Sequence, residues 1–155
     1  MQISTGAFDY NTAIKNTIVD LAGSGLHVIE YPTGHVDTIE VAVRRAVVTG
    51  ANQTACKTQE KLADQLEVDL VEVSAHGGAR PSHAKWQGKV YSRKGRVTIN
   101  GETYEDFKTA TGYGSGAGLA GWNCRHTFFP YVPGASRSWT GAELAALDNK
   151  DFEYN

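Results

Sequence analysis

Apolar and polar residues alternate with two different periods in the first quarter of the chain. From residue 11 to residue 22 the apolar positions lie three or four residues apart, which predicts a helix with one apolar face. Asp9 or Asn11 is placed to cap this helix by accepting a hydrogen bond from its first backbone N–H groups. Residues 26–31 alternate with a period of two and end at Pro32, which predicts a strand followed by a turn.

A second and longer helical pattern covers residues 37–66. Asp37 or Thr38 is placed to cap it, and apolar residues keep the three-to-four spacing through its first half. Gly50 lies near the middle and weakens a helix by about 1 kcal/mol relative to alanine, so a break into two helices at this residue stays open as an alternative to one long helix. Residues 68–73 alternate weakly and predict a strand that leads directly into a histidine.

The second half of the chain mixes short helices and strands. Pro81 suits the first turn of a short helix that ends before Gly88. Residues 89–92 and 96–99 have strand character and predict a hairpin with its turn between them. The remaining expected elements are a short helix over residues 102–109, a glycine-rich loop over 112–118, a strand over 124–132 and a C-terminal helix that starts at a capping box over 140–143.

Together these elements predict an α+β fold, in which N-terminal helices pack on a small, mostly antiparallel sheet with a long glycine-rich loop. The length of 155 residues is that of a single domain, and 41% hydrophobic with 21% charged residues is a globular composition. A net charge of −2 argues against a whole surface that binds nucleic acid non-specifically. No apolar run reaches membrane-spanning length. Cys56 and Cys124 could form one bridge, but their spacing does not indicate a secreted disulfide framework.

Side chains suited to catalysis or metal binding gather in two short segments, residues 76–91 and 121–131. These segments hold three of the five histidines, one of the two cysteines and two of the three tryptophans. Because buried polar groups need partners, we predict that the two segments converge in one site. Trp86 and Trp122 are expected to form the aromatic core around it. The expected members of the site are His76, Arg80, His83, Trp86, Asn123, Cys124, Arg125 and His126.

The residues leave three interpretations of this site open. Cys124 and His126 would point the same way on an extended strand. With His76 and His83 they supply the four nitrogen and sulfur ligands that zinc takes. A hydrogen-bonded polar core without metal is the second interpretation. In the third, the site is catalytic: His76 or His83 acts as a general base, Arg80 binds an anion and His126 completes the candidate set.

Three stretches of the sequence resemble the phage minor capsid protein 2 family: residues 71–92, residues 112–126 and residues 42–53. The first reads VEVSAHGGARPSHAKWQGKVYS and the second reads GYGSGAGLAGWNCRH. The resemblance covers most of the chain, from about residue 4 to residue 134. The chain is also similar, more distantly, to the Mu F-type head morphogenesis domain, in which a late Cys-Arg-Cys stands where this chain has Cys-Arg-His.

The resemblance implies a structural or interaction domain carried in small copy number in the head of a tailed phage. Its expected partners are the portal or other head proteins and the packaged DNA, with no membrane and no small-molecule substrate. Family members carry a longer N-terminal region, so residues 1–155 are expected to be a single domain at the C-terminal end of a longer protein. That protein would be made in the bacterial cytoplasm and localise to the virion. The rival class is a small hydrolase, nuclease or toxin-like enzyme that uses the histidines, arginine and cysteine of the site.

Overall fold

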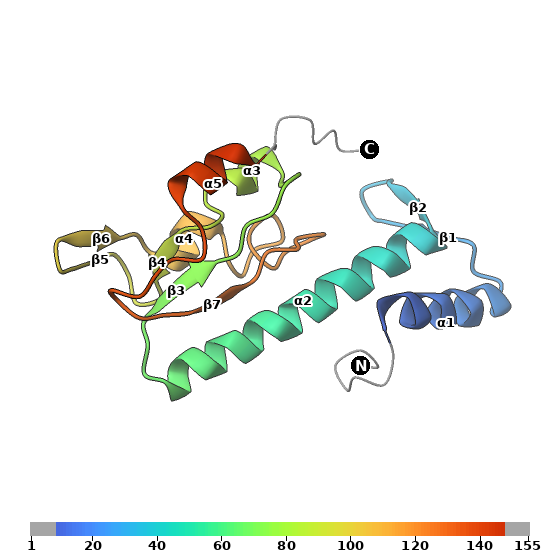
Figure 1. Ribbon diagram of the computed structural model, residues 1–155. Coiled ribbons are helices and arrows are strands. Elements are labelled where there is room, and N and C mark those ends of the chain that lie inside the picture. Colours follow the sequence, from blue (N-terminus) through green and yellow to red (C-terminus); the bar gives the residue numbers. More distant parts are fainter. Residues whose placement is uncertain (1–8, 148–155) are drawn as a thin grey trace.

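Residues 9–147 are described by the computed structural model, and they form an α+β fold around one long helix (Figure 1). The predicted fold class is confirmed, and the strands pair antiparallel within three small sheets. The elements, in chain order, are α1 (Tyr10–Gly23), β1 (Val28–Glu30), β2 (Val36–Thr38), α2 (Ile39–Gln65), β3 (Leu70–Val73), α3 (Pro81–Ala84), β4 (Val90–Ser92), β5 (Val97–Ile99), β6 (Glu102–Tyr104), α4 (Phe107–Thr111), β7 (Phe128–Tyr131) and α5 (Gly141–Ala146).

The N-terminal part of the fold, residues 9–48, forms an arm made of α1, β1, β2 and the first turns of α2. The helix α1 begins at Asp9, whose carboxylate accepts a hydrogen bond from the Thr12 backbone N–H at 2.8 Å. It packs against α2 and buries Ala13 and Ile14. The strands β1 and β2 form a hairpin beside α2. Figure 1 shows this arm at one end of α2, away from the three-stranded sheet.

The helix α2 continues without a break through Gly50, so the long helical stretch predicted over residues 37–66 is confirmed and the alternative of two helices is wrong. Thr38 occupies the N-cap position, although its side chain makes no capping hydrogen bond. α2 packs against α1 and against β7, and this tertiary packing offsets the cost of about 1 kcal/mol for a central glycine. Within residues 9–147, neither α2 nor any other helix is both long and apolar enough to cross a membrane.

The central sheet has the strand order β4–β3–β7, with both pairs antiparallel. All four residues of β3 are buried, which explains why the alternation over residues 68–73 is weak in the sequence. The outer strand β7 packs against α2 (Figure 1). The long helix therefore supports the sheet and the segment that enters β7.

The predicted hairpin between residues 89–92 and 96–99 is wrong. The strand β4 pairs with β3 instead, and β5 forms a hairpin with β6. The turn of that hairpin is made by Asn100 and Gly101, which both adopt left-handed backbone conformations, with φ of 52° and 82°. An Asn-Gly pair favours this kind of two-residue turn, because its backbone twist matches that of the strands it joins.

The helix expected over residues 102–109 is displaced along the chain. The first residues of that range form β6, and α4 begins only at Phe107. Its cap is Asp106, whose carboxylate accepts a hydrogen bond from a backbone N–H of the first turn at 2.8 Å. The C-terminal helix α5 begins as predicted, at a capping box formed by Thr140 and Glu143.

The main hydrophobic core lies around β3, β7 and the loop that precedes β7. Trp86 is buried in it, as predicted. Trp122 was expected there as well, but it is 65% exposed, so this expectation is wrong. Its indole covers the backbone of Gly116, where an added Cβ would lie 2.6 Å from the ring. The members of the core are Cys56, Val71, Val73, Trp86, Tyr91, Phe107, Leu119, Ala120, Cys124 and Phe128.

Residues 112–127 follow α4 without a further helix or strand and fold back on themselves. Two glycines permit close contact between backbone segments. A Cβ on Gly118 would lie 2.0 Å from the carbonyl oxygen of Gly112, and a Cβ on Gly121 would lie 2.1 Å from that of Gly116. The two residues between these glycines are buried in the core. These close backbone contacts therefore fix the conformation of the loop where it leads into the candidate site.

Candidate functional site

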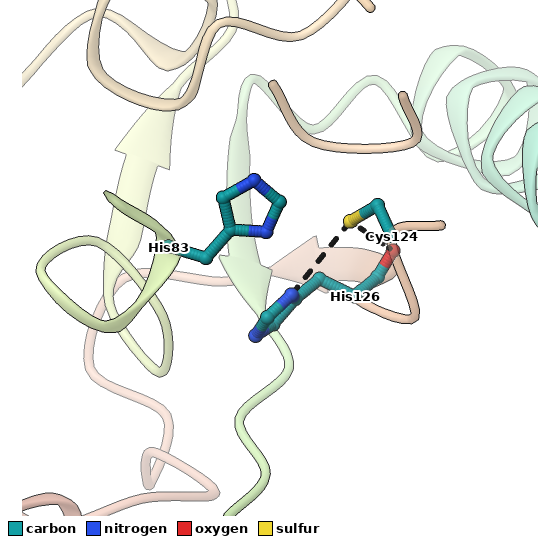
Figure 2. A group of neighbouring side chains, drawn as sticks. All are labelled: His83, Cys124 and His126. Atoms are coloured by element: carbon teal, nitrogen blue, oxygen red, sulfur yellow. Dashed lines mark hydrogen bonds between the residues drawn. The ribbon is translucent and has the colours of Figure 1, made fainter. Parts of the chain in front are cut away.

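Three buried side chains, His83, Cys124 and His126, meet between α3 and the loop that precedes β7 (Figure 2). One nitrogen of each imidazole and the sulfur atom all lie within 4.8 Å of one another. The three residues are only 2%, 1% and 1% exposed. The predicted convergence of the two segments is therefore confirmed for these residues, which we call the His–Cys–His cluster.

The short helix α3 positions His83. Pro81 begins this helix, as predicted, and the carbonyl of the preceding Arg80 accepts a hydrogen bond from the His83 backbone N–H at 2.8 Å. Trp86 follows the helix, and its ring centroid lies 4.6 Å from that of His83 and 4.9 Å from that of His126. The buried tryptophan thus forms an apolar wall of the cluster.

The long helix α2 holds the segment that contains Cys124 and His126. The side-chain amide of Asn52 donates hydrogen bonds to the backbone carbonyls of both residues, at 2.9 Å each. The amide of Gln53 donates to a carbonyl of the preceding loop at 3.2 Å. The strand expected over residues 124–132 begins only with β7, so these amides align the cysteine and the histidine. The sequence marked this part of α2 through the family resemblance alone.

Gln87, which sequence reasoning missed, determines the tautomer of His126. Its Oε1 accepts a hydrogen bond from the His76 backbone N–H at 3.1 Å, and an N–H group can only donate. The same oxygen lies 2.9 Å from Nε2 of His126, so the neutral imidazole carries its proton on that nitrogen. The lone pair of Nδ1 then faces the sulfur of Cys124, which is 3.7 Å away.

His83 is oriented in the same manner by a backbone carbonyl. Its Nε2 lies 3.0 Å from the carbonyl oxygen of Ala117, which can only accept, so Nε2 carries the proton. The lone pair of the neutral ring is therefore on Nδ1. Figure 2 shows ring nitrogens of His83 and His126 turned toward the sulfur of Cys124.

Burial sets the protonation of the His–Cys–His cluster. Loss of hydration, together with His76, His83 and Arg80 nearby, lowers the pKa of His126 to about 3. Burial also lowers the pKa of His83 and raises the pKa of the Cys124 thiol. At neutral pH the metal-free cluster therefore holds two neutral imidazoles and a protonated thiol. This thiol is not an activated nucleophile, because nucleophilic attack requires the thiolate.

His76 and Arg80 lie beside the cluster. The His76 ring stacks on that of His126 with 4.2 Å between centroids and 29° between planes. Its Nδ1 is 2.9 Å from the Gly77 carbonyl oxygen, and its Nε2 is buried without a hydrogen-bond partner among residues 9–147. The Arg80 guanidinium donates to the carbonyl of Trp122. Of the four ligands proposed from the sequence, three thus converge, and His76 is stacked next to them.

A groove of about 430 Å³ adjoins the cluster, lined by α2, by the segment after β3 and by the loop before β7. Within the described range 9–147 no acidic residue lines it, and four of its lining residues are arginines: Arg44, Arg45, Arg80 and Arg125. Arg45 also forms an ion pair with Asp37 at 2.8 Å, whereas Arg44 and Arg125 are exposed. We call this feature the basic groove. Its chemistry suits an anion.

Other polar groups near the two segments have structural partners. Glu72 is 1% exposed, and its Oε1 accepts a hydrogen bond from the Ser138 backbone N–H at 2.8 Å. Asn123 lines the basic groove, and its backbone N–H donates to the hydroxyl of Thr49 at 3.2 Å. Neither Cys56 nor Cys124 forms a disulfide. Glu72 is therefore engaged in the fold, and the part of the chain that the structure describes places no carboxylate in the groove for acid–base chemistry.

The family model of phage minor capsid protein 2 matches residues 1–155. The chain belongs to this family. A curated relative, described as a structural protein of Lactococcus phage LL-H, is 28% identical to it over 141 residues. That match covers 88% of this chain and 37% of the relative, so the chain spans little more than a third of the relative's length. No solved structure matches the chain significantly.

Membership of this family, together with a relative that is a phage structural protein, supports a structural role for the chain in a phage and indicates the virion as its location. Two of the stretches that carry the resemblance, residues 71–92 and 112–126, are the stretches that meet in the His–Cys–His cluster. The third stretch, residues 42–53, supplies the amides of α2 that hold them. The three stretches that carry the resemblance therefore come together in this chain, at one buried site and in the part of α2 that holds it.

Proposed function

We propose that this minor capsid protein 2 domain is an interaction module of the phage head that binds at the portal and takes part in head morphogenesis. It acts as the C-terminal domain of a longer protein that is made in the host cytoplasm and carried into the virion. Family membership and the structural relative support this role. We assign the contact with the portal protein to the N-terminal arm and the contact with packaged DNA to the basic groove.

The apolar surface of the N-terminal arm is the observation that carries the portal contact. Within residues 9–147, nine large apolar side chains are exposed, and five of them belong to the arm: Val19, Leu26, Val28, Val36 and Val41. Exposed apolar side chains that gather on one part of a molecule mark contacts with other proteins. The arm extends along α2 away from the sheet (Figure 1), so a partner can cover it without disturbing the core.

The basic groove supports packaged DNA as a second partner. A guanidinium group presents parallel N–H donors that match the oxygens of a phosphate. Arg44 and Arg125 are exposed in the groove, and of the residues that the structure describes no carboxylate lines it to repel a phosphate. Because the whole chain has a net charge of −2, we expect local attraction at this groove and no general binding of nucleic acid over the whole surface.

The same geometry gives less support to the hydrolase, nuclease or toxin-like alternative. Such enzymes need a group that moves a proton or an activated nucleophile. Among residues 9–147 no carboxylate lines the basic groove, and burial raises the pKa of the Cys124 thiol in the metal-free cluster beside it. The imidazole Nε2 protons of His83 and His126 are donated to internal acceptors. Binding to other components of the phage head is therefore the function that this arrangement supports best.

Photocrosslinking in assembled phage heads tests both contacts. A photoreactive amino acid at Val28, on the arm, should crosslink to the portal protein. The same amino acid at Arg125, in the basic groove, should crosslink to DNA in full heads. Lys94 is the matched control, because its side chain is 76% exposed in the turn after β4, away from the arm, and it should crosslink to neither. Crosslinks from Val28 only to the major shell protein would contradict the portal contact. The absence of a crosslink from Arg125 to DNA in full heads would contradict the DNA contact.

A further inference from the structure

We propose that His83, Cys124 and His126 bind one zinc ion, with Nδ1 of each imidazole and the Cys124 sulfur as its protein ligands. The ion would join the segment after β3 to the loop before β7. This inference is independent of the portal and DNA contacts, because it concerns how the domain is held together. Three observations carry it: the donor atoms, their spacing and the groups that orient them.

The donor atoms are those that zinc prefers. Zinc is bound by cysteine sulfur and by histidine nitrogen, and the cluster offers two imidazole lone pairs and one sulfur. Hydrogen bonds of the two Nε2 atoms place the remaining lone pair on Nδ1 in both rings. Harder ions such as magnesium and calcium require carboxylates, and between residues 9 and 147 the chain places none in the lining of the adjoining groove.

The spacing of the donor atoms is close to that of an occupied site. Bond lengths of about 2.3 Å to sulfur and about 2.0 Å to nitrogen, at a tetrahedral angle, separate sulfur from nitrogen by roughly 3.5 Å and two nitrogens by roughly 3.3 Å. The Cys124 sulfur lies 3.7 Å from Nδ1 of His126, so the distance between these two ligand atoms is already close to that of an occupied zinc site. The donor atoms of all three residues lie within 4.8 Å of one another. Side-chain adjustments of about 1 Å therefore complete the geometry.

Each ligand is oriented by a neighbour that does not touch the ion. In zinc sites a ligating histidine usually donates its second N–H to a carbonyl or carboxylate, which fixes the ring and its tautomer. Here the Ala117 carbonyl does this for His83 at 3.0 Å, and Gln87 does it for His126 at 2.9 Å. Asn52 fixes the backbone on both sides of the Cys-x-His turn. A polar core alone would not require both imidazoles to direct Nδ1 at one sulfur.

Binding converts the thiol to a thiolate and releases one proton to solvent, because zinc takes cysteine as the thiolate. The S–H···Nδ1 hydrogen bond between Cys124 and His126 is then replaced by two bonds to the ion. The basic groove, which all three ligands line, leaves space beside the ion for a fourth ligand. Because the ligands come from two distant segments, the bound ion stabilises the folded state over the unfolded chain.

The test uses the 155-residue chain purified from zinc-supplemented cells. Elemental analysis should find one zinc per chain, and a strong chelator should lower Tm by about 5 °C or more. After replacement of zinc by cobalt, a thiolate-to-cobalt absorption band should be present. Cys124→Ser should remove that band, whereas Cys56→Ser is the matched control at the other buried cysteine and should retain it. His27→Ala, at an exposed histidine outside the cluster, should also keep the metal.

Zinc well below one per chain, no thiolate band with cobalt and a Tm indifferent to chelator would together overturn the proposal. A band that is lost in Cys56→Ser and kept in Cys124→Ser would also overturn it. If Cys124→Ser does not fold, the cobalt spectra of the unsubstituted chain and of Cys56→Ser still decide, because they report directly whether the other sulfur is bound.

Discussion

Uncharged amide side chains orient the histidine and cysteine of the His–Cys–His cluster in this protein. Gln87 and Asn52 carry no chemistry of their own, yet they determine which nitrogen of His126 faces Cys124 and how the turn between those two residues is held. Composition and motif spacing pointed to the histidines and the cysteine. They did not point to these amides, because a glutamine or asparagine is chemically unremarkable until its partners, far away in sequence, are known. Glu72 could not be placed from the sequence either, since its strand is buried on both faces.

The two tryptophans of the site segments should differ in their effect on stability. Trp86→Ala removes a ring that is 4% exposed and should lower the free energy of unfolding by about 3–5 kcal/mol. Trp122→Ala removes a ring that is 65% exposed and should cost less than about 1 kcal/mol. Chemical denaturation of both variants measures the difference. Equal losses would show that the exposed indole stabilises the fold as much as the buried one.

Among the secondary-structure elements, those with local signals were predicted and those that depend on distant partners were not. The helices α1, α3 and α5 begin at Asp9, Pro81 and the Thr140 capping box, all of which are readable over a few residues. The pairing of β4 with β3 is a non-local choice that no turn residue reveals. The β5–β6 hairpin is an exception, because it has a local signal, the Asn-Gly pair at residues 100–101, but the expected hairpin lay one strand earlier.

In the loop before β7, residues 112–127, the glycines at which two backbone segments come close together should not tolerate a side chain. Gly118→Ala would place a methyl group 2.0 Å from a backbone oxygen, where only a shift of the backbone can relieve the overlap. We expect a loss of about 1–3 kcal/mol in the free energy of unfolding, as for other overpacked sites. Gly141→Ala is the matched control, because nothing lies within 4 Å of its added Cβ, and it should change stability by less than about 0.5 kcal/mol. Thermal melts that rank the two variants equally would refute the close contact.

At the scale of the whole molecule, α2 connects the two parts to which we assign different roles. One end carries the N-terminal arm with its exposed apolar side chains, and the middle carries the amides that hold the His–Cys–His cluster (Figure 1). The convergence of the two polar segments was predictable because buried polar groups must find partners. The continuity of α2 through Gly50 was not predictable, since it depends on packing against α1 and β7.

The central claim is that this chain is a structural component of the phage head placed at the portal. Localised cryo-EM reconstruction of the portal vertex in mature virions tests it most directly. The account predicts density that fits the long helix α2 with its three-stranded sheet, with the N-terminal arm against the portal, at that vertex and at no other. Equal density at every vertex of the shell, or purified virions without this chain, would contradict it.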